Sequence, residues 1–422
     1  MRASAFDLNL PRLMLSSMAA MPIPASDHGI SLPVAHTIET PRRLAIVEQM
    51  AALGPQFGAR AVAHDREAAF PYQNWDDLKA AGLLGICIPV EEGGLGGDFV
   101  AYALASAELG RWCATTALTY NMHVATTLLV GQIADDLELS AQDRELLHQR
   151  RGELRRGIVV DHLIHSQPFS EGVAAGETSG FNTRAVPVDG GFRITGRKIF
   201  ASLSGAADIH NIVCSVAGDK RIRFIGVPAG AEGLRIEGEW DPLGMRGTDS
   251  RNLVLDDVFV PQANEWIPPG LFDQAARRWP YFYVTLSFAY LGLMRGILDA
   301  AGAYLRGEGS PTARRDHPIK QQGWAQMNLI YDRAQALCYQ VLAESGVDPG
   351  SAALRRAWSS TVTIMEGAPE IASLAIRICG GRSMLRPSYL EQAYRDARCG
   401  ATMLPWSVEV CLERLGRWGL YQ

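Results

Sequence analysis

The sequence has little cysteine, no long hydrophobic run and almost no excess of charge of either sign. Its seven cysteines among 422 residues are scattered and form no Cys-x-x-C pair, which predicts reduced thiols in a cytosolic protein and neither a disulfide framework nor a zinc site. No run of about 18 uninterrupted apolar residues occurs, so no membrane-spanning helix is expected. With 40 Lys and Arg against 45 Asp and Glu, the net charge of −5 argues against a dedicated nucleic-acid-binding protein.

Several catalytic motifs are also missing. The sequence contains no His-Glu-x-x-His, no Walker loop, no Gly-x-Ser-x-Gly elbow and no Gly-x-Gly-x-x-Gly after a predicted strand. The nine histidines show no metal-ligand spacing, and the nearest pair, His162 and His165, is interpreted as two ordinary side chains. We therefore predict no metal site.

Composition and hydrophobic periodicity divide the chain into three blocks after a start without a clear pattern. Residues 1–36 show no clear periodicity and are expected to form a flexible tail. Helical periodicity dominates residues 37–157, short runs rich in Val, Ile and Phe dominate 158–265, and helical texture returns over 266–422. The expected fold class is α+β in the order helical, β, helical, which excludes a Rossmann repeat because strands and helices do not alternate throughout.

Local signals place elements within these blocks. Residues 209–216, 222–227 and 253–260 predict strands, and Asp-Gly-Gly at 189–191 predicts a hairpin turn. The glycines of 93–97 predict a loop, because glycine weakens the interior of a helix.

Four separated segments carry the strongest signal. They lie at residues 82–97, 196–208, 243–251 and 394–398 and read GLLGICIPVEEGGLGG, GRKIFASLSGAAD, LGMRGTDSR and YRDAR. In this order they resemble the acyl-CoA dehydrogenase superfamily of flavoproteins. The resemblance implies an N-terminal helical domain, a central β domain and a C-terminal four-helix bundle, with FAD between the β domain and the bundle. It also implies a homodimer or homotetramer in which the neighbouring subunit reaches the adenine end of the FAD.

The resemblance further implies residues that contact the cofactor. Ser166 and Gln167 stand where the family has a segment against the isoalloxazine, and Phe200 matches an aromatic residue on one face of the ring. Ser202 matches a Thr or Ser whose hydroxyl and amide reach the reactive nitrogen edge. Hydrogen bonds fixed at this edge matter because a reduced flavin carries charge that they can stabilise.

Two more cofactor contacts are implied near the end of the chain. Gly380 and Gly381 fit a place where the backbone approaches a cofactor closely, since a Cβ would intrude. The pyrophosphate is expected to meet an arginine of the segment 306–315, because guanidinium suits it, and Arg306 is the candidate that we name.

The catalytic base of the family is missing from both of its usual places. An acyl-CoA dehydrogenase removes a proton beside a thioester carbonyl while the flavin takes a hydride, and the proton normally goes to a Glu. Counting along the matched segments puts Leu404 and Phe282 at the two positions of that Glu, so both are expected to line the substrate pocket. Tyr283, Tyr281 and Glu366 remain as candidate bases, although Glu366 precedes the glycine pair that the family's base follows.

Three functions stay open from the sequence. The first, which we favour, is dehydrogenation of an acyl thioester of CoA or acyl carrier protein, with a separate electron-transfer partner; Asp249 and Arg251 resemble the family's substrate-side turn. The second is a monooxygenase of the same fold, which takes reduced flavin from a partner reductase and hydroxylates nitrogen, sulfur or an aromatic carbon. An apolar site with Leu404, Phe282 and Trp279 would suit it by excluding water. The third is a binding scaffold without activity. The expected location is the cytoplasm.

Overall fold

Six helices form the first part of the chain in the computed structural model, which describes residues 34–172, 181–308 and 312–421. They are α1 (Ala35–Ile38), α2 (Pro41–Glu67), α3 (Tyr72–Ala80), α4 (Phe99–Trp112), α5 (Ala114–Leu128) and α6 (Ala141–Val159). Side-chain caps fix three of their starts. Thr40, Asp98 and Ser140 accept hydrogen bonds from the backbone N–H groups of Arg43, Ala101 and Asp143, at 3.4, 2.8 and 3.0 Å. The predicted tail lies outside the described residues except for its end.

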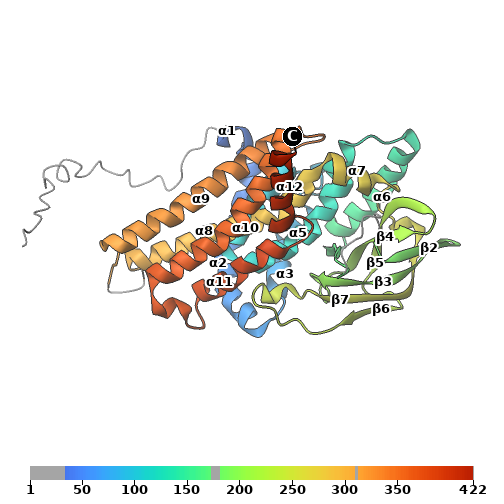
Figure 1. Cartoon of the computed structure of the whole chain (residues 1–422). Coiled ribbons are helices and arrows are strands. Elements are labelled where there is room, and N and C mark those ends of the chain that lie inside the picture. The colour runs from blue at the N-terminus through green and yellow to red at the C-terminus, as the bar shows by residue number, and fades with distance from the viewer. Residues whose placement is uncertain (1–33, 173–180, 309–311, 422) are drawn as a thin grey trace, which may run out of the picture. The chain divides into compact units, whose positions relative to one another are not determined.

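The middle of the chain folds into one sheet (Figure 1). Its strands are β1 (His165–Ser166), β2 (Arg184–Val188), β3 (Gly191–Ala201), β4 (Ile209–Val216), β5 (Asp219–Pro228), β6 (Leu234–Glu237) and β7 (Arg251–Pro261). Their order is β1-β4-β2-β3-β7-β6, with β5 paired to β4. The predicted hairpin is confirmed, because Val188 pairs with Gly191 and Gly190 takes a φ of +76° in the turn.

Helices return after the sheet and form the C-terminal bundle. They are α7 (Leu271–Arg278), α8 (Thr285–Arg306), α9 (Pro318–Glu344), α10 (Ser351–Cys379), α11 (Tyr389–Cys399) and α12 (Val408–Leu420). The long helices α8, α9 and α10 run side by side, and α11 packs against α8 and α10 (Figure 1). The predicted α+β fold class is thereby confirmed. By length and composition the segment Pro280–Arg306 could cross a membrane. However, 89% of its most apolar stretch is buried inside the protein, as in a core helix.

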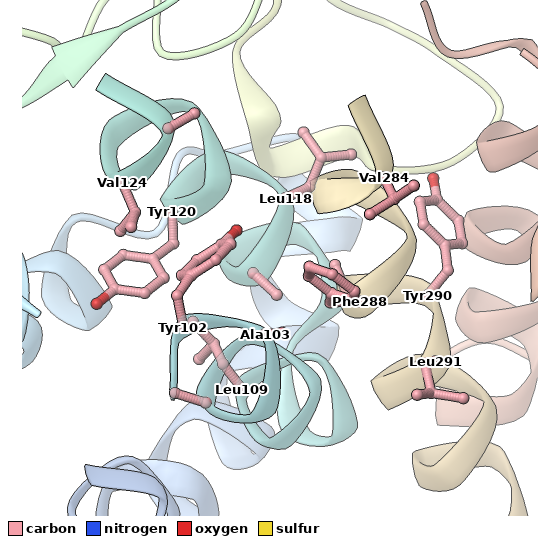
Figure 2. Packing of buried hydrophobic residues seen from close by; sticks show 14 of the residues in the cluster. Tyr102, Ala103, Leu109, Leu118, Tyr120, Val124, Val284, Phe288, Tyr290 and Leu291 are labelled. Carbon is pink, nitrogen blue, oxygen red and sulfur yellow. The ribbon is translucent and has the colours of Figure 1, made fainter. Parts of the chain in front are cut away.

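Helices α4 and α8 cross with almost no space between their backbones. A Cβ at Gly110 would overlap the carbonyl oxygen of Ala289, and a Cβ at Gly292 would overlap that of Ala107. Around this crossing the rings of Tyr102 and Phe288 pack edge to face with centroids 6.3 Å apart, and Figure 2 shows them among side chains of α4, α5 and α8. The N-terminal helices and the bundle therefore share one hydrophobic core.

The predicted domain boundaries can be placed on these elements. The boundary between residues 157 and 158 falls in the last turn of α6, and the one between 265 and 266 falls in the connection from β7 to α7. All seven cysteines are free, as predicted from their spacing.

Candidate functional site

A cavity of about 670 Å³ lies where the helical N-terminal part, the sheet and the bundle meet. Its wall is formed by α5, the segment after β1, the end of β3, the segment before β7, the start of α8 and the segment after α11. Most of the lining is apolar, including Leu118, Met122, Ile199, Phe282, Leu286 and Leu404. A pocket of this size and polarity suits a planar aromatic ligand together with a small substrate.

Six residues predicted from the sequence line this cavity: Gln167, Phe200, Ser202, Phe282, Tyr283 and Leu404. Phe200 sits at an irregularity in the pairing of β3 with β7 and has a φ of +50°, which turns its side chain away from the sheet core. The residue is 64% exposed, and its ring meets that of Trp240 edge to face with centroids 6.2 Å apart. An aromatic face is thus left open at the cavity for a flat ligand to cover.

Ser202 begins a row of hydroxyl groups that runs into the wall. Its Oγ lies 2.8 Å from the Oγ of Ser250, which lies 2.7 Å from the Oγ1 of Thr248. The Thr248 hydroxyl in turn donates to the carbonyl oxygen of Met245 at 2.9 Å. Ser250 and Thr248 were not predicted as site residues, although both lie in the matched segment 243–251.

Glu171 is the one carboxylate that lines the cavity among residues 34–172, 181–308 and 312–421, and it is fully engaged. Its Oε1 accepts hydrogen bonds from Lys198 Nζ at 2.7 Å and from the Thr183 hydroxyl at 2.7 Å. Burial raises the pKa of Glu171, but the bonds from Lys198 and Thr183 outweigh it and hold the pKa below its usual value. The ammonium of Lys198 is completely buried and also donates to the carbonyl oxygen of Val213. Glu171 therefore anchors the wall and is a poor candidate for a base.

The remaining titratable groups of the cavity are a phenol and a thiol. Burial raises the pKa of Tyr283 to about 12 and that of Cys399 to about 11, so both are neutral near pH 7. The Tyr283 ring packs against Trp406 at 5.7 Å, and the Cys399 thiol donates weakly to the carbonyl oxygen of Arg395. Neither group is poised to take a proton from carbon at neutral pH.

Two of the predicted bases lie away from the cavity. Tyr281 is completely buried against Trp279, with ring centroids 5.9 Å apart, and burial raises the pKa of its phenol to about 12. Trp279, expected in the apolar site, instead donates to Asp136 at 2.8 Å and is not part of the lining. Glu366 on α10 is 44% exposed and forms two hydrogen bonds with the guanidinium of Arg398, at 3.1 and 3.2 Å. The geometry thus gives no support to Tyr281 or Glu366 as catalytic residues, because neither side chain reaches the cavity.

Replacing Glu366 by glutamine is therefore expected to leave kcat/KM within about twofold of the wild type. The substitution removes one exposed ion pair, which contributes about 1 kcal/mol or less to stability. Steady-state kinetics with any turned-over substrate checks this. A fall of roughly 100-fold, the size expected for loss of a general base, would restore Glu366 as a catalytic residue.

Three further predicted site residues do not line the first cavity: Asp249, Arg251 and Ser166. Arg251 Nε donates to Asp249 Oδ1 at 2.6 Å, and Asp249 Oδ2 accepts from the backbone N–H of Gly205 at 2.8 Å, so both side chains fix the turn before β7. The Ser166 hydroxyl is completely buried and shares a 2.8 Å hydrogen bond with His210 Nδ1. These residues shape the site from behind its surface.

A layer of neutral polar groups supports this part of the wall. Gln167 Nε2 and Asn211 Nδ2 both donate to the Thr126 hydroxyl, at 2.9 and 3.0 Å. Burial lowers the pKa of His165 to about 3 and that of His210 to about 4, so both imidazoles are neutral at pH 7. Within the described ranges no group of three His, Cys, Asp or Glu side chains is placed to hold a metal ion.

A second cavity, of about 490 Å³, lies beside the end of α10 and carries positive charge. It is lined by Tyr304, Glu308, Arg314, Lys320, Cys379, Gly380, Gly381 and Arg382. The Arg314 guanidinium lies 4.4 Å from the centre of the Tyr304 ring, and Lys320 donates to the carbonyl oxygen of Ile378. Arg306, predicted to meet a pyrophosphate, pairs with Glu308 at 2.6 Å and is not part of the lining. Arg314 is the arginine of the segment 306–315 that lines this cavity, because the chain turns back after α8.

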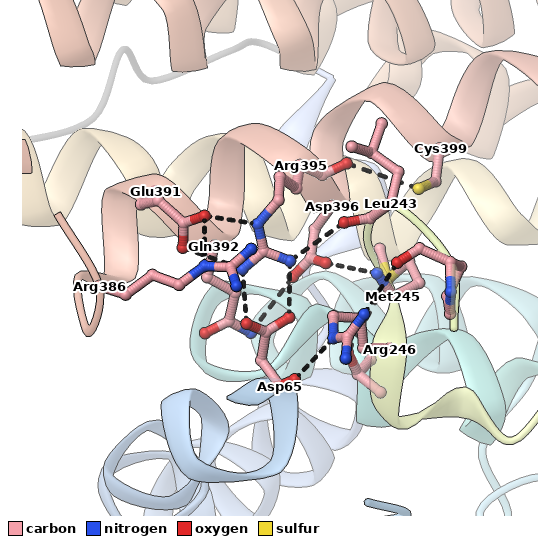
Figure 3. Close-up of polar contacts among 12 residues, drawn as sticks. Asp65, Leu243, Met245, Arg246, Arg386, Glu391, Gln392, Arg395, Asp396 and Cys399 are labelled. Carbon is pink, nitrogen blue, oxygen red and sulfur yellow. Dashed lines mark hydrogen bonds and ion pairs between the residues drawn. The ribbon is translucent and has the colours of Figure 1, made fainter. Parts of the chain in front are cut away.

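A buried ionic network holds the segment before β7 against two helices. Arg395 of α11 makes two hydrogen bonds with the carboxylate of Asp65 of α2, at 2.5 and 2.9 Å. The neighbouring Asp396 accepts the backbone N–H of Met245 at 2.5 Å and an amide hydrogen of Gln392 at 3.2 Å (Figure 3). Burial raises the pKa of Asp396 to about 7. The network ties the Met245 wall of the first cavity to helices from both ends of the chain.

Three family models match the chain in order. The acyl-CoA dehydrogenase N-terminal domain matches residues 40–135, its middle domain 168–258 and its C-terminal domain 282–404. The mitochondrial short-chain specific acyl-CoA dehydrogenase of Homo sapiens is 27% identical over 343 residues, which cover 79% of each chain.

Two solved structures share the fold at low identity. Butyryl-CoA dehydrogenase from Megasphaera elsdenii has a TM-score of 0.75 at 20% identity and covers 91% of this chain and 99% of that chain. Dibenzothiophene monooxygenase, TdsC, from Paenibacillus sp. A11-2 has a TM-score of 0.75 at 22% identity and covers 89% and 97%. TdsC has also been solved with FMN bound.

Proposed function

The chain belongs to the acyl-CoA dehydrogenase family of flavin enzymes, and we propose that it is an oxygenating member, which uses reduced flavin and molecular oxygen to hydroxylate a small apolar substrate. One observation carries the proposal: within residues 34–172, 181–308 and 312–421 the cavity has no carboxylate free to take a proton from carbon. Dehydrogenation of an acyl thioester needs such a base, whereas oxygen transfer to nitrogen, sulfur or an aromatic carbon does not.

The two cavities fit the two chemical parts of FAD, with the ring in the larger cavity and the diphosphate of a neighbouring subunit's FAD in the smaller one. The larger one has apolar walls and the open face of Phe200, which suit a planar tricyclic ring, and Ser202 and Gln167 supply polar contacts at its edge. The smaller one gathers the cationic side chains of Arg314 and Lys320, which suit a diphosphate. A Cβ added at Gly380 or Gly381 would meet nothing, so the space beside them is open to a ligand. FAD is therefore the form of flavin that we propose.

In this proposal the protein binds the flavin, orients the substrate and keeps the site dry. Reduced flavin supplies the two electrons with which oxygen delivers one atom to the substrate, while the other atom leaves as water. Phe282, Leu404 and Leu286 exclude bulk water from the reacting atoms. Tyr283 has no hydrogen-bond partner among the described residues, so its hydroxyl is free to donate to a polar atom of the substrate.

The experiment uses probes that separate oxygenation from dehydrogenation. The purified chain is mixed with FAD, an NADH-dependent flavin reductase, isotopically labelled oxygen and dibenzothiophene or indole. The expected result is a product that carries one labelled oxygen atom, detected by mass spectrometry. Butyryl-CoA added to the oxidised holoenzyme under anaerobic conditions is the counterpart. Loss of the flavin absorbance with butyryl-CoA, without labelled product in the first assay, would reverse the assignment in favour of a dehydrogenase.

Replacing Tyr283 by phenylalanine is expected to leave the dissociation constant of FAD within about threefold and oxygen transfer within about tenfold of the wild type. The reason is that the substitution removes one hydroxyl, equivalent to about one hydrogen bond, and keeps the ring. If Tyr283 were instead the base of a dehydrogenase, the same substitution would abolish flavin reduction by butyryl-CoA. Rapid-mixing spectroscopy of the flavin distinguishes the two results.

The assembly and partners follow from the same proposal. Electrons come from a partner flavin reductase, and the chain works in the cytoplasm as a homodimer or homotetramer in which the cation-rich cavity serves the flavin of a neighbouring subunit. The seven free cysteines support a reducing compartment. Sedimentation of the holoenzyme tests the subunit number.

A further inference from the structure

The hydroxyl row from Ser202 to Met245 has a direction that its contacts determine. Each of Thr248, Ser250 and Ser202 carries a single hydroxyl hydrogen, and three short oxygen–oxygen contacts join them to each other and to the Met245 carbonyl. A carbonyl oxygen only accepts, so the Thr248 hydrogen goes to Met245 O at 2.9 Å.

The assignment of the hydrogens can then be continued from Thr248, at the inner end of the row, to Ser202 at the cavity. Because Thr248 has given its hydrogen to Met245, the 2.7 Å contact with Ser250 requires Ser250 to donate. Ser250 has then used its own hydrogen, so the 2.8 Å contact with Ser202 requires Ser202 to donate. The opposite direction would leave the Thr248 oxygen and the Met245 carbonyl oxygen facing each other at 2.9 Å without a hydrogen between them. Only the inward direction makes all three hydrogen bonds.

The other donor of Ser202 is also used inside the protein. Its backbone N–H donates to the carbonyl oxygen of Phe200 at 2.9 Å, in the turn that ends β3. The hydroxyl and the amide of Ser202 are thus both satisfied, and what remains toward the cavity is the pair of acceptor sites on Oγ.

We propose that Ser202 faces the cavity as a hydrogen-bond acceptor and thereby selects reduced flavin over oxidised flavin. The inference rests on the proposed function, since it places the flavin ring edge at Ser202. The reactive ring nitrogen of oxidised flavin carries a lone pair, which repels an acceptor, whereas the same nitrogen of reduced flavin carries an N–H, which an acceptor binds. Such a site takes up the reduced cofactor from a reductase and releases the oxidised one.

The inner end of the row is held by the side chain of Asp396. Asp396 accepts the Met245 N–H at 2.5 Å, on the same residue whose carbonyl receives the Thr248 hydrogen. This hydrogen bond fixes the backbone at Met245, where the row ends. Ser204, in the same turn as Ser202, donates to the carbonyl oxygen of Asp249 at 2.7 Å and stands outside the row.

The test measures the affinity of the protein for FAD in its two redox states. Dissociation constants of oxidised FAD, and of FAD reduced with dithionite under anaerobic conditions, are determined for the full chain by titration. The wild type is expected to bind reduced FAD about tenfold more tightly, as one favourable contact replaced by one unfavourable contact implies. A tenfold preference raises the two-electron potential of the bound flavin by about 30 mV relative to free FAD, which a reference-dye titration measures independently.

Three serine variants test whether the preference for reduced FAD comes from Ser202. The ratio of the dissociation constant of oxidised FAD to that of reduced FAD is expected to fall from about ten to about one in Ser202→Ala. In Ser250→Ala it is expected to fall below one, because the freed Ser202 hydrogen then turns to the cavity and favours oxidised FAD. Ser204→Ala is the matched control and leaves the ratio unchanged. A wild type that binds oxidised FAD at least as tightly as reduced FAD, or a Ser202→Ala variant with a raised ratio, overturns the proposal.

These outcomes are separate from those of the oxygenation assay. A protein that prefers reduced FAD and responds to Ser202→Ala as expected, but oxidises butyryl-CoA, keeps this inference and loses the proposed function. A protein that forms labelled product yet shows no such preference keeps the function and loses the inference.

Discussion

Replacing Lys198 by methionine is expected to lower the free energy of unfolding by about 3–5 kcal/mol, the range measured when one partner of a buried ion pair is removed. Lys198 is completely buried and Glu171 is 7% exposed, so the variant leaves a carboxylate inside the protein without its cation. It also takes a hydrogen-bond donor from the carbonyl oxygen of Val213. Urea unfolding, followed by circular dichroism, measures the change.

The neighbouring ion pair on the same strand supplies the control. Arg197 pairs with Glu237 at 2.9 Å, but the two side chains are 51% and 41% exposed. Arg197→Met is therefore expected to change stability by about 1 kcal/mol or less. If Lys198→Met and Arg197→Met lowered the free energy of unfolding equally, the buried ion pair would contribute no more to stability than the exposed one.

The Lys198 variant should also weaken flavin binding, because Glu171 belongs to the cavity wall. The pKa of Glu171 lies below its usual value in the wild type, so the stability it contributes is present above pH 4.5 and is lost as the pH falls through the lowered pKa. Removing Lys198 removes the main cause of that lowering. Without Lys198, burial favours the protonated carboxyl of Glu171 in the variant, which is relieved as the pH falls, so the difference in stability between wild type and variant should shrink as the pH is brought down from 7 to 4.

Replacing Asp396 by asparagine is expected to change how stability depends on pH, with the largest effect between pH 4 and pH 7. Burial raises the pKa of Asp396 from 3.8 to about 7, so between these values the folded protein holds a proton that the unfolded chain has lost. The stabilisation is complete below the unfolded pKa and is lost as the pH rises through the folded pKa. Three pH units correspond to about 4 kcal/mol.

The measured quantity is the stability of the wild type minus that of Asp396→Asn, from urea unfolding at several pH values. This difference should fall from pH 4 to pH 7 and become flat above. Subtraction removes the contribution of the buried histidines, which changes in the opposite sense because the pKa values of His165 and His210 are lowered. A flat difference across the whole range would mean that Asp396 is ionised in the folded protein throughout.

The groups around Asp396 do not obscure the effect. The electrostatic neighbours of its carboxyl are Asp65, Arg395, Cys113, Tyr290, Tyr389 and Cys399. Burial raises the pKa values of the two phenols and two thiols, so these groups stay neutral throughout the range measured. Asp256→Asn, at a carboxylate that is 67% exposed, is the control and is expected to change stability by less than about 1 kcal/mol at each pH.

Much of the fold could be predicted because its elements are local in sequence. Residues 209–216 coincide with β4, and the predicted runs 222–227 and 253–260 lie within β5 and β7. Alternation and turn residues encode such strands directly. The meeting of Phe200, Phe282 and Leu404 in one cavity could not be derived that way and was accessible only through resemblance to a family.

The parts that sequence reasoning missed depend on the path of the chain in space. Glu171 and Lys198 are separated by 27 positions, and nothing in their spacing announces an ion pair between a loop and a strand. Arg314, which lines the second cavity in place of Arg306, gets there because the chain reverses after α8. Glu366, a candidate base from the sequence, forms hydrogen bonds with Arg398, a partner that is 32 positions away and that its local sequence does not indicate.

The glycine contact between α4 and α8 limits how this protein can change. Since Gly110 and Gly292 bring two backbones together without side chains between them, any larger residue there would push the helices apart. Substrate selectivity is better altered at rim positions such as Leu404 and Phe200, which line the cavity and are 55% and 64% exposed. A library confined to rim positions should yield folded variants with altered selectivity, whereas one that includes the two glycines should yield mostly insoluble protein.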